Sequence, residues 1–315
     1  MSDYLATRHA AYATPPSQIA ALIAELTPAP IRTIDKIERG YDHEVYQVFT
    51  TDDRLFVRIR RHGQASAADE VWAIDSARAA GVPVPTVLLC ERRLLDGAAR
   101  EVMIQRAVPG RPLAELIDNL DDTSLERCIV HAGAALARLH TVAVEGFYKR
   151  HSSVWDFSTF EAIAVSNLDA RAAERQALLN LGFTDAEFDR LLETLAAIER
   201  RLPWRIPILL HGDLTLEHLF FDNDLTLTGV IDFGDFQGGS PIVDLAALLQ
   251  LPRVRLDWLR SGYGPSEAWE GFAERRLAHQ IGFTIGSLAH HASIGDEAAT
   301  ADLAAQLRHI LRIIP

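Results

Sequence analysis

The first third of the chain alternates apolar and polar residues in the way that β-strands do. This period of two predicts strands that pair in sequence, with turns at Asp52-Asp53 and at Asp96-Gly97. The strands predicted in this way are 31–38, 44–50, 54–60, 86–93 and 100–108. The pattern therefore indicates an antiparallel sheet that is built from neighbouring segments of the chain.

Helical spacing of apolar residues precedes and interrupts these strands, and it dominates the chain after residue 111. The early helices are 17–26, with Ser17 as its N-cap, and 67–80, which Gly81 closes. The later helices are 123–141, 158–180, 184–201, 242–250, 267–289 (capped by Ser266) and 297–312, with short strands at 208–214, 218–222 and 225–235.

This order of elements predicts an α+β protein with two lobes. A small N-terminal antiparallel sheet lobe occupies residues 1–106, and a larger, mainly helical lobe occupies 107–315, after a sharp connection at Pro109-Gly110. Strands and helices do not alternate regularly along the chain, so a doubly wound parallel sheet is not expected.

Composition and charge narrow the functional classes. The 315 residues are 48% hydrophobic and 23% charged, as in globular proteins, and they contain no long apolar run and no secretory signal pattern. The two cysteines, Cys90 and Cys128, do not have the spacing of a zinc site or a disulfide framework. We therefore expect a cytoplasmic protein without a membrane-bound part.

The negative charge is concentrated in the second lobe. Of the net charge of −12, residues 1–106 carry −1 (14 acids, 13 bases) and residues 107–315 carry −11 (29 acids, 18 bases). A nucleic-acid partner needs a basic face and is disfavoured, whereas a cationic ligand is favoured. The acids could also serve solubility alone.

The sharpest chemical motif lies in the short β region, within LLHGDLTLEHLFF and the following GVIDFGD. His211, Asp213 and His218 fit the pattern H-x-D-x-x-x-x-[N/H], and Asp232-Phe233-Gly234 begins 19 residues after Asp213. Phosphoryl transfer from a nucleotide needs a carboxylate that accepts a hydroxyl proton, together with groups that hold the metal ions on the phosphates. Strand ends at one edge would bring these side chains together.

These motifs resemble those of the aminoglycoside phosphotransferase and choline kinase family, the small-molecule branch of the protein-kinase-like fold. The resemblance covers roughly residues 30–310. It implies that Asp213 is the catalytic base and that Asp232 and His218 hold Mg2+. His218 replaces the usual asparagine, as in the aminoglycoside 2″- and macrolide 2′-phosphotransferases. His211 and Asp244 are then structural, with Asp244 bracing the catalytic loop.

The N-terminal lobe fits the same family and would bind ATP or GTP. Arg58 falls where the family has its phosphate-binding lysine, because Lys36 is on the wrong strand and Lys149 lies in the helical lobe. Glu70 matches the helix glutamate that would pair with it. The remaining nucleotide-binding candidates are Gly40 of the loop GYDHEVY and Met103, Gln105 and Arg106 of the interlobe segment, which would meet the purine.

Two features indicate a cationic small molecule as the phosphate acceptor. Only six residues separate Gly234 from Pro241, too few for a segment that holds a peptide, so no obligate protein partner is expected. Residues 151–200 carry nine acids and four bases. The spacing predicts that Glu267 and Glu270 share one helix face with Glu274, and with Asp235 they are the candidate substrate residues.

An aminoglycoside is the favoured acceptor. The alternatives are a macrolide or another natural product, an endogenous metabolite such as choline, homoserine or methylthioribose, or a nucleotide-binding regulator without turnover. The regulator is suggested by the departures at Arg58 and His218, and it is opposed by the presence of both Asp213 and Asp232.

Overall fold

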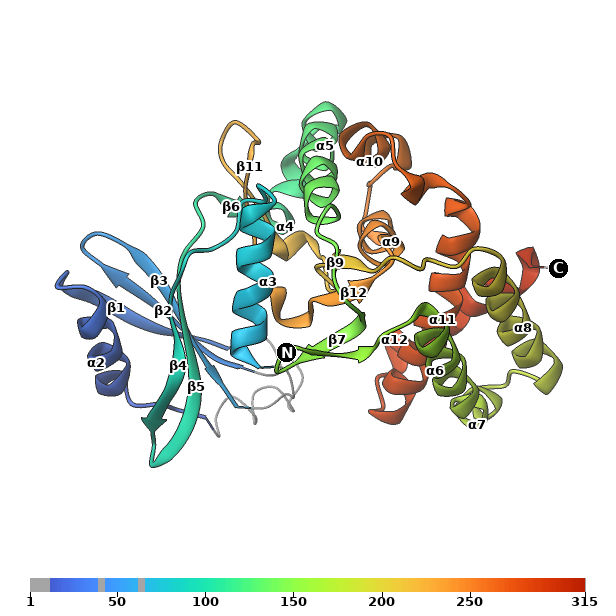
Figure 1. Ribbon diagram of the computed structural model, residues 1–315, viewed down its shortest axis with the longest axis horizontal. Helices are drawn as coiled ribbons and strands as arrows, with labels where there is room; N and C mark the ends of the chain where they lie inside the picture. Colours follow the sequence, from blue (N-terminus) through green and yellow to red (C-terminus); the bar gives the residue numbers. More distant parts are fainter. Residues whose placement is uncertain (1–11, 39–42, 62–65, 315) are drawn as a thin grey trace.

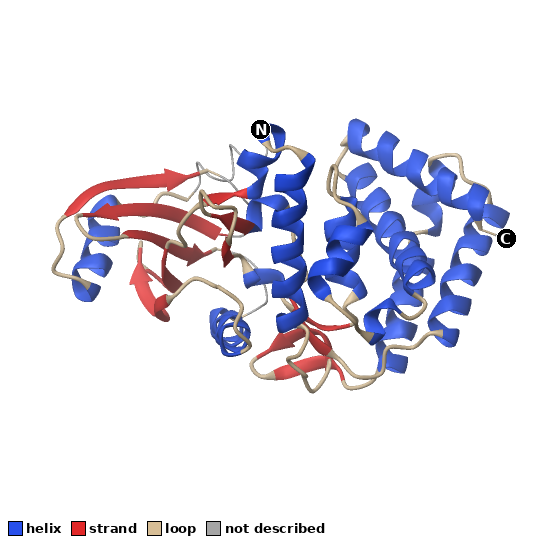
Figure 2. Ribbon diagram, turned by 90° about the horizontal axis from the view of Figure 1, so that it is seen from above, coloured by secondary structure: helices blue, strands red, loops and turns tan. Residues whose placement is uncertain are grey.

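The computed structural model describes residues 12–38, 43–61 and 66–314. The strands of the N-terminal sheet gather at one end of the molecule and most of the helices at the other, as Figure 1 and Figure 2 show. The predicted α+β class, with an antiparallel sheet part and a mainly helical part, is therefore confirmed. The lobe boundary between residues 106 and 107 stays a prediction, although the last strand of the sheet ends at Arg106.

The N-terminal sheet is antiparallel and has the strand order β1-β2-β3-β5-β4. Its strands agree with the predicted ones within a few residues. They are β1 (Ile31–Ile37), β2 (His43–Thr50), β3 (Arg54–Arg60), β4 (Val87–Leu95) and β5 (Ala98–Arg106). Side chains alternate between the two faces, so Leu55, Val57 and Ile59 are buried on one face while Arg58 lies on the other.

Two helices cover the two faces of this sheet. Helix α2 (Pro16–Leu26) packs Ile19, Leu22 and Ile23 against the buried face. It begins at Pro16 without a side-chain cap, so the predicted role of Ser17 is wrong, because proline already satisfies the first helical turn. Helix α3 (Ala67–Ala79) lies between the sheet and the helical part, and its apolar residues belong to the core of that part (Figure 1).

The second part of the chain is built from short strands among longer helices. Its first elements are β6 (Arg111–Pro112), α4 (Leu113–Leu116), α5 (Asp122–Leu139), β7 (Phe147–His151), β8 (Val154–Phe157), α6 (Phe160–Ala173), α7 (Arg175–Asn180) and α8 (Asp185–Arg201). The later ones are β9 (Ile208–Leu210), β10 (Leu219–Phe221), β11 (Leu227–Val230), β12 (Gln237–Gly239), α9 (Ile242–Gln250), α10 (Leu256–Tyr263), α11 (Phe272–Ser293) and α12 (Glu297–Ile313).

The helix predicted over 267–289 is broken. Residues Glu267–Trp269 form a short 3-10 helix capped by Ser266, Gly271 adopts a left-handed conformation with φ of 58°, and α11 starts at Phe272. Glu267 and Glu270 therefore do not lie on one helix with Glu274, and the prediction of a common helical face is wrong. The turn residue that interrupts the helix is a glycine, which accepts positive φ readily.

Two small sheets place the chemistry-bearing loops. One sheet has the strand order β8-β7-β12-β9, and the other has the order β11-β10-β6. The β7–β8 hairpin was not predicted. None of the helices in the described ranges is long and apolar enough to span a membrane.

Helices α5 and α10 cross in backbone contact, and a glycine makes this possible. A Cβ atom on Gly262 would lie 2.0 Å from the carbonyl oxygen of Val130. Gly262→Ala should therefore lower the free energy of unfolding by about 1–3 kcal/mol or more, because two helix backbones must separate. Gly282→Ala is the matched control, because its nearest neighbour would be Leu195 at 3.9 Å, and alanine is the better helix former. Urea unfolding of both variants checks this, and equal losses would contradict it.

Candidate active site

The side chain of Asp244 organises the loop that carries the central motif. This carboxylate is fully buried at the start of α9, and it accepts hydrogen bonds from the backbone N–H groups of His211 (2.8 Å) and Gly212 (2.9 Å). The Nε2 atom of His140 lies 3.1 Å from it. Burial alone would raise the pKa of Asp244, but these hydrogen bonds and the neighbouring imidazoles lower it below its ordinary value.

The loop that follows β9 presents Asp213 to solvent. Gly212 has a φ of 86°, and a Cβ atom there would lie 2.1 Å from the carbonyl oxygen of Asp235, so only glycine fits. The buried His211 donates from Nε2 to the carbonyl of Ile231 at 2.8 Å, which leaves Nδ1 to accept the N–H of Asp213 at 3.3 Å. The loop therefore fixes the backbone of Asp213 while its carboxylate stays exposed.

Asp232 and His218 meet beside this loop. Asp232 adopts a left-handed backbone conformation (φ 65°, ψ 63°), a strained state that is common at functional sites. His218 donates from Nδ1 to the carbonyl oxygen of Asp213 at 2.7 Å, so its Nε2 atom is directed toward Asp232, whose Oδ2 lies 3.8 Å away. The sequence places these two residues 14 positions apart, and the fold brings them together.

Arg58 connects the N-terminal sheet to this loop. Its guanidinium forms an ion pair with Glu70 of α3, and its second terminal nitrogen lies 3.2 Å from Oδ1 of Asp232. Burial disfavours the charged form of arginine, but the two carboxylates raise the pKa of Arg58 overall. Burial would likewise raise the pKa of Asp232, yet the charge of Arg58 and nearby imidazoles lowers it.

Arg58, Asp213, His218 and Asp232 line a cavity of about 810 Å³ between the sheet and the loop that carries Asp213. Of the predicted nucleotide-binding residues, Arg58, Gln105 and Arg106 line it. Met103 is buried and accepts a hydrogen bond from Gln105 through its sulfur, without lining the cavity itself. Gly40 lies outside the described residues.

Two further residues that the sequence patterns do not indicate also line this cavity. Lys149 reaches it from the β7–β8 hairpin, with Nζ 2.7 Å from Oδ1 of Asp235. His43 at the start of β2 also lines it, and its Nδ1 atom is buried without a hydrogen-bond partner in the described part of the chain. Burial and the charges of Arg58 and Arg60 lower the pKa of His43 to about 3, so its imidazole is neutral at pH 7. The sequence patterns do not predict the β7–β8 hairpin, so they do not place Lys149 at this cavity.

A buried ion pair holds α3 against the β7–β8 hairpin. Asp69 accepts hydrogen bonds from the backbone N–H of Ser152 (2.7 Å) and from Arg150 (2.5 Å). The guanidinium of Arg150 also lies 4.2 Å from the ring centre of Trp72 on α3. Glu70 is the next residue after Asp69, so the same helix turn that is fastened to the hairpin presents the partner of Arg58.

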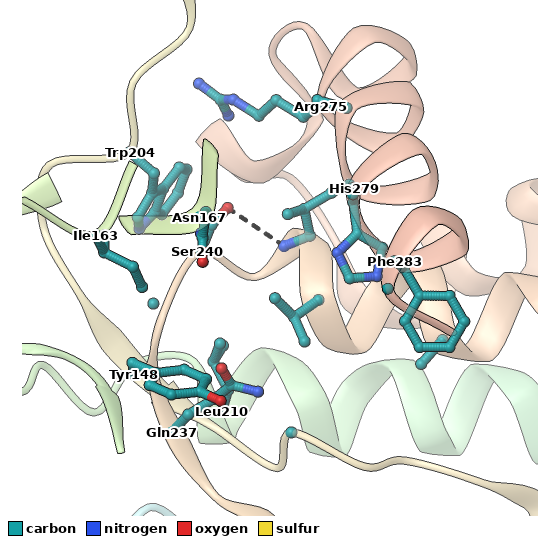
Figure 3. Close-up of a pocket in the computed structure, with 18 of the residues that line it drawn as sticks. Tyr148, Ile163, Asn167, Trp204, Leu210, Gln237, Ser240, Arg275, His279 and Phe283 are labelled. Carbon is teal, nitrogen blue, oxygen red and sulfur yellow. Dashed lines mark hydrogen bonds between the residues drawn. The ribbon is translucent and has the colours of Figure 1, made fainter. Parts of the chain in front are cut away.

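A second, larger cavity of about 950 Å³ adjoins the first, and Asp213 and Tyr148 line both. Figure 3 shows Tyr148, Leu210 and Gln237 on one side of this cavity, and His279 and Phe283 of α11 on another. Its walls are mainly aliphatic and aromatic. The predicted substrate residue Asp235 lines only the smaller cavity, and Glu267 and Glu270 line neither.

The donor groups fit a magnesium ion that arrives with a nucleotide. No group of three or more His, Cys, Asp or Glu side chains among the described residues could hold a metal by itself. Mg2+ commonly uses one or two protein ligands and completes its octahedron with phosphate oxygens and water. Asp232 supplies a hard carboxylate for this, and Nε2 of His218 could bind the metal or one of its waters.

Together, the two-part fold, the adjoining cavities and the carboxylates beside Arg58 define a kinase-like phosphotransferase. The comparisons with known proteins agree. A profile of the phosphotransferase enzyme family matches residues 33–290, and the chain belongs to that family. No protein in the curated collection matches the chain.

Solved structures share the fold at low sequence identity. Aminoglycoside phosphotransferase APH(4)-Ia superposes with a TM-score of 0.70 and 15% identity, covering 94% of this chain and 98% of that one. APH(2″)-IIIa in a complex with GDP and kanamycin gives 0.66 and 18%, covering 93% and 98%. A variant of APH(4)-Ia was solved with ADP and hygromycin B, with a TM-score of 0.70, 15% identity, and 93% and 97% covered.

The Asp244 brace predicts a measurable dependence of stability on this carboxylate. Asp244→Asn should lower the free energy of unfolding by about 3–5 kcal/mol, because an amide NH2 must face a backbone N–H donor. The folded-state pKa lies below the ordinary 3.8, so the stabilisation is present above that value and is lost as the pH falls through the folded-state pKa. The melting temperature of the variant should therefore depend less on acid.

Exposed Asp302 makes no hydrogen bond or ion pair in the described chain, and Asp302→Asn provides the control. Melting curves from neutral pH to below pH 4 should leave this control close to the wild type. An Asp244→Asn protein as stable as the control would show that the brace is unimportant.

Proposed function

We propose that this protein transfers the terminal phosphoryl group of ATP or GTP to a hydroxyl group of a small molecule. The observation that carries the proposal is that Asp213 lines both cavities. A nucleotide in the smaller cavity and an alcohol in the larger one would meet at this carboxylate. In-line transfer needs this meeting of donor and acceptor beside one proton acceptor.

Asp213 would accept the proton of the attacking hydroxyl. Its carboxylate is exposed, and it makes no hydrogen bond within the described residues, so it is free to receive the proton. Bound Mg2+ would supply charge neutralisation on the phosphates, with Asp232 and His218 as the candidate ligands. Arg58 would bind phosphate oxygens, as its planar pair of donors suits them. Lys149 is a further candidate for this role.

The lining of the larger cavity bears on the acceptor. The relatives solved with hygromycin B and with kanamycin support an aminoglycoside. However, the larger cavity is walled mainly by apolar side chains, among them Phe147, Phe160, Ile163 and Phe283. This favours the second candidate, a natural product with more apolar surface, because apolar walls gain most from apolar ligands.

A panel of acceptors tests the proposal directly. Purified protein with ATP or GTP and Mg2+ would be incubated with aminoglycosides, macrolides, choline, homoserine and methylthioribose, and nucleoside diphosphate release and product mass would be measured. Phosphorylation of any member supports a small-molecule kinase. Nucleotide binding in a thermal-shift series without any transfer would instead favour the regulator.

Asp213→Asn should lower turnover by roughly 10²–10⁴-fold, because the proton acceptor is lost while the loop geometry remains. Nucleotide affinity should hardly change. Glu217→Gln provides the control, because this exposed residue lines the same smaller cavity and its carboxylate makes no hydrogen bond or ion pair in the described chain. Steady-state kinetics with the best acceptor check both variants. Retention of more than about a tenth of wild-type turnover in Asp213→Asn would refute the role of this residue.

Arg58→Ala should raise the KM for nucleotide and lower kcat together, because the guanidinium would contact phosphates in the ground and transition states. Arg58→Lys should recover only part of the activity. Glu70→Gln should give a milder defect, and the double variant should show a coupling of about 0.5–3 kcal/mol. Arg32→Ala on β1, which is exposed, is the control. Strictly additive defects would mean that Glu70 does not orient Arg58.

A further inference from the structure

One end of the larger cavity contains two hydrogen-bond donors that nothing in the described chain satisfies. Trp204 lies between α8 and β9, and Arg275 lies in the first turn of α11. The Nε1 atom of Trp204 and one terminal nitrogen of Arg275 are buried without a partner. Figure 3 shows both side chains on the side of the cavity away from Tyr148 and Gln237. Tyr148 also lines the smaller cavity, so the unsatisfied donors face the end opposite the nucleotide.

The two side chains hold each other in place. The guanidinium carbon of Arg275 lies 5.2 Å from the ring centre of Trp204, within cation–π range, and its Nε donates to the carbonyl oxygen of Leu202 at 3.4 Å. Buried N–H groups without acceptors are uncommon in native proteins, and each costs free energy. An arrangement that orients two of them at one end of a ligand-sized cavity is therefore suited to an acceptor group that arrives from outside.

The charge at this end is positive and unpaired. Arg275 makes no ion pair within 4.0 Å in the described part of the chain, while its neighbour Glu274 pairs with Arg201 at 2.7 Å. Burial lowers the pKa of Arg275, and the charges of Glu270 and Glu267 act against this from outside the cavity. A guanidinium nevertheless stays protonated at neutral pH.

The carboxylates of the larger cavity do not make it a site for a polycation. Apart from Asp213 they are Glu174 and Glu199, and burial raises the pKa of Glu199 to about 7, so its negative charge is only partial at neutral pH. Arg171 lines the same cavity, with its guanidinium where a side chain on Gly286 would otherwise lie. Two arginines therefore offset the two glutamates.

We propose that the Trp204–Arg275 pair binds an oxyanion of the phosphate acceptor, such as a carboxylate. The acceptor would then be a largely apolar, hydroxylated molecule with an anionic group at the end remote from the phosphorylated hydroxyl. This inference rests on the proposed function, because it assumes that the larger cavity holds the acceptor. It departs from the cationic acceptor that the net charge of the chain suggested.

Two matched dyes test the pair without requiring turnover. Anilinonaphthalene sulfonate and N-phenylnaphthylamine share their aromatic body, and only the first carries an oxyanion. Fluorescence titrations would be done with saturating magnesium and the non-hydrolysable nucleotide AMP-PNP, which keeps the dyes out of the smaller cavity. The sulfonate should bind roughly tenfold more tightly or better, as expected for one charge-assisted hydrogen bond.

Variants locate the effect. Arg275→Met should weaken sulfonate binding by roughly tenfold or more, and Trp204→Phe, which keeps an aromatic ring but removes the N–H, by roughly threefold to tenfold. Neither should change the affinity of the neutral dye. Arg171→Met is the matched control from the same cavity and should leave sulfonate binding nearly unchanged. Arg275→Lys should recover part of the affinity, and it replaces Arg275→Met if that protein does not fold.

Each contrary outcome overturns the inference. The Trp204–Arg275 pair does not bind an oxyanion if the two dyes bind with equal affinity or if the sulfonate does not bind. The same conclusion follows if Arg171→Met and Arg275→Met lose equal sulfonate affinity. Binding of AMP-PNP is measured separately by thermal shift. Nucleotide binding with a failed dye test removes this inference alone, whereas absent nucleotide binding removes the proposed function and this inference together.

Discussion

The buried carboxylate of Asp244 is the constraint on which the candidate site depends. A charge at 0% exposure is tolerated only when its hydrogen bonds are complete, and Asp244 obtains them from His140 and from the backbone of His211 and Gly212. These bonds join the ends of α5 and β9 to the start of α9. They therefore set the position of Asp213, the residue at which the two cavities meet.

Ion pairs connect the sheet and helix α3 to the helical part of the chain. Arg58 joins Glu70 to Asp232, and Asp69 of the same helix joins Arg150 of the β7–β8 hairpin. A phosphate or a metal ion that enters between these groups would compete for the same charges. A ligand bound there would therefore change the charge balance between the sheet and the loop that carries Asp232.

A charge sum over a segment does not show which of its carboxylates face a ligand. The acids of residues 151–200 suggested a polycationic ligand, but several serve local structure. Asp185 and Asp189 pair with Arg175, and Glu187 completes a capping box at the start of α8. The larger cavity presents mainly apolar walls, and its two arginines are matched by Glu174 and Glu199. Net charge gives the balance of acids and bases in a lobe, and packing decides which of these groups face a ligand.

The sequence by itself determined the strands of the N-terminal sheet, most helices and the motif residues Asp213 and Asp232, because these depend on short-range periodicity and on local spacing. It predicted the pairing of Arg58 with Glu70 only through a family resemblance. The break at Gly271, the β7–β8 hairpin that brings Lys149 into the smaller cavity, and the lining of the larger cavity were decided by the tertiary structure. Each depends on contacts between segments far apart in the chain, which local patterns do not encode.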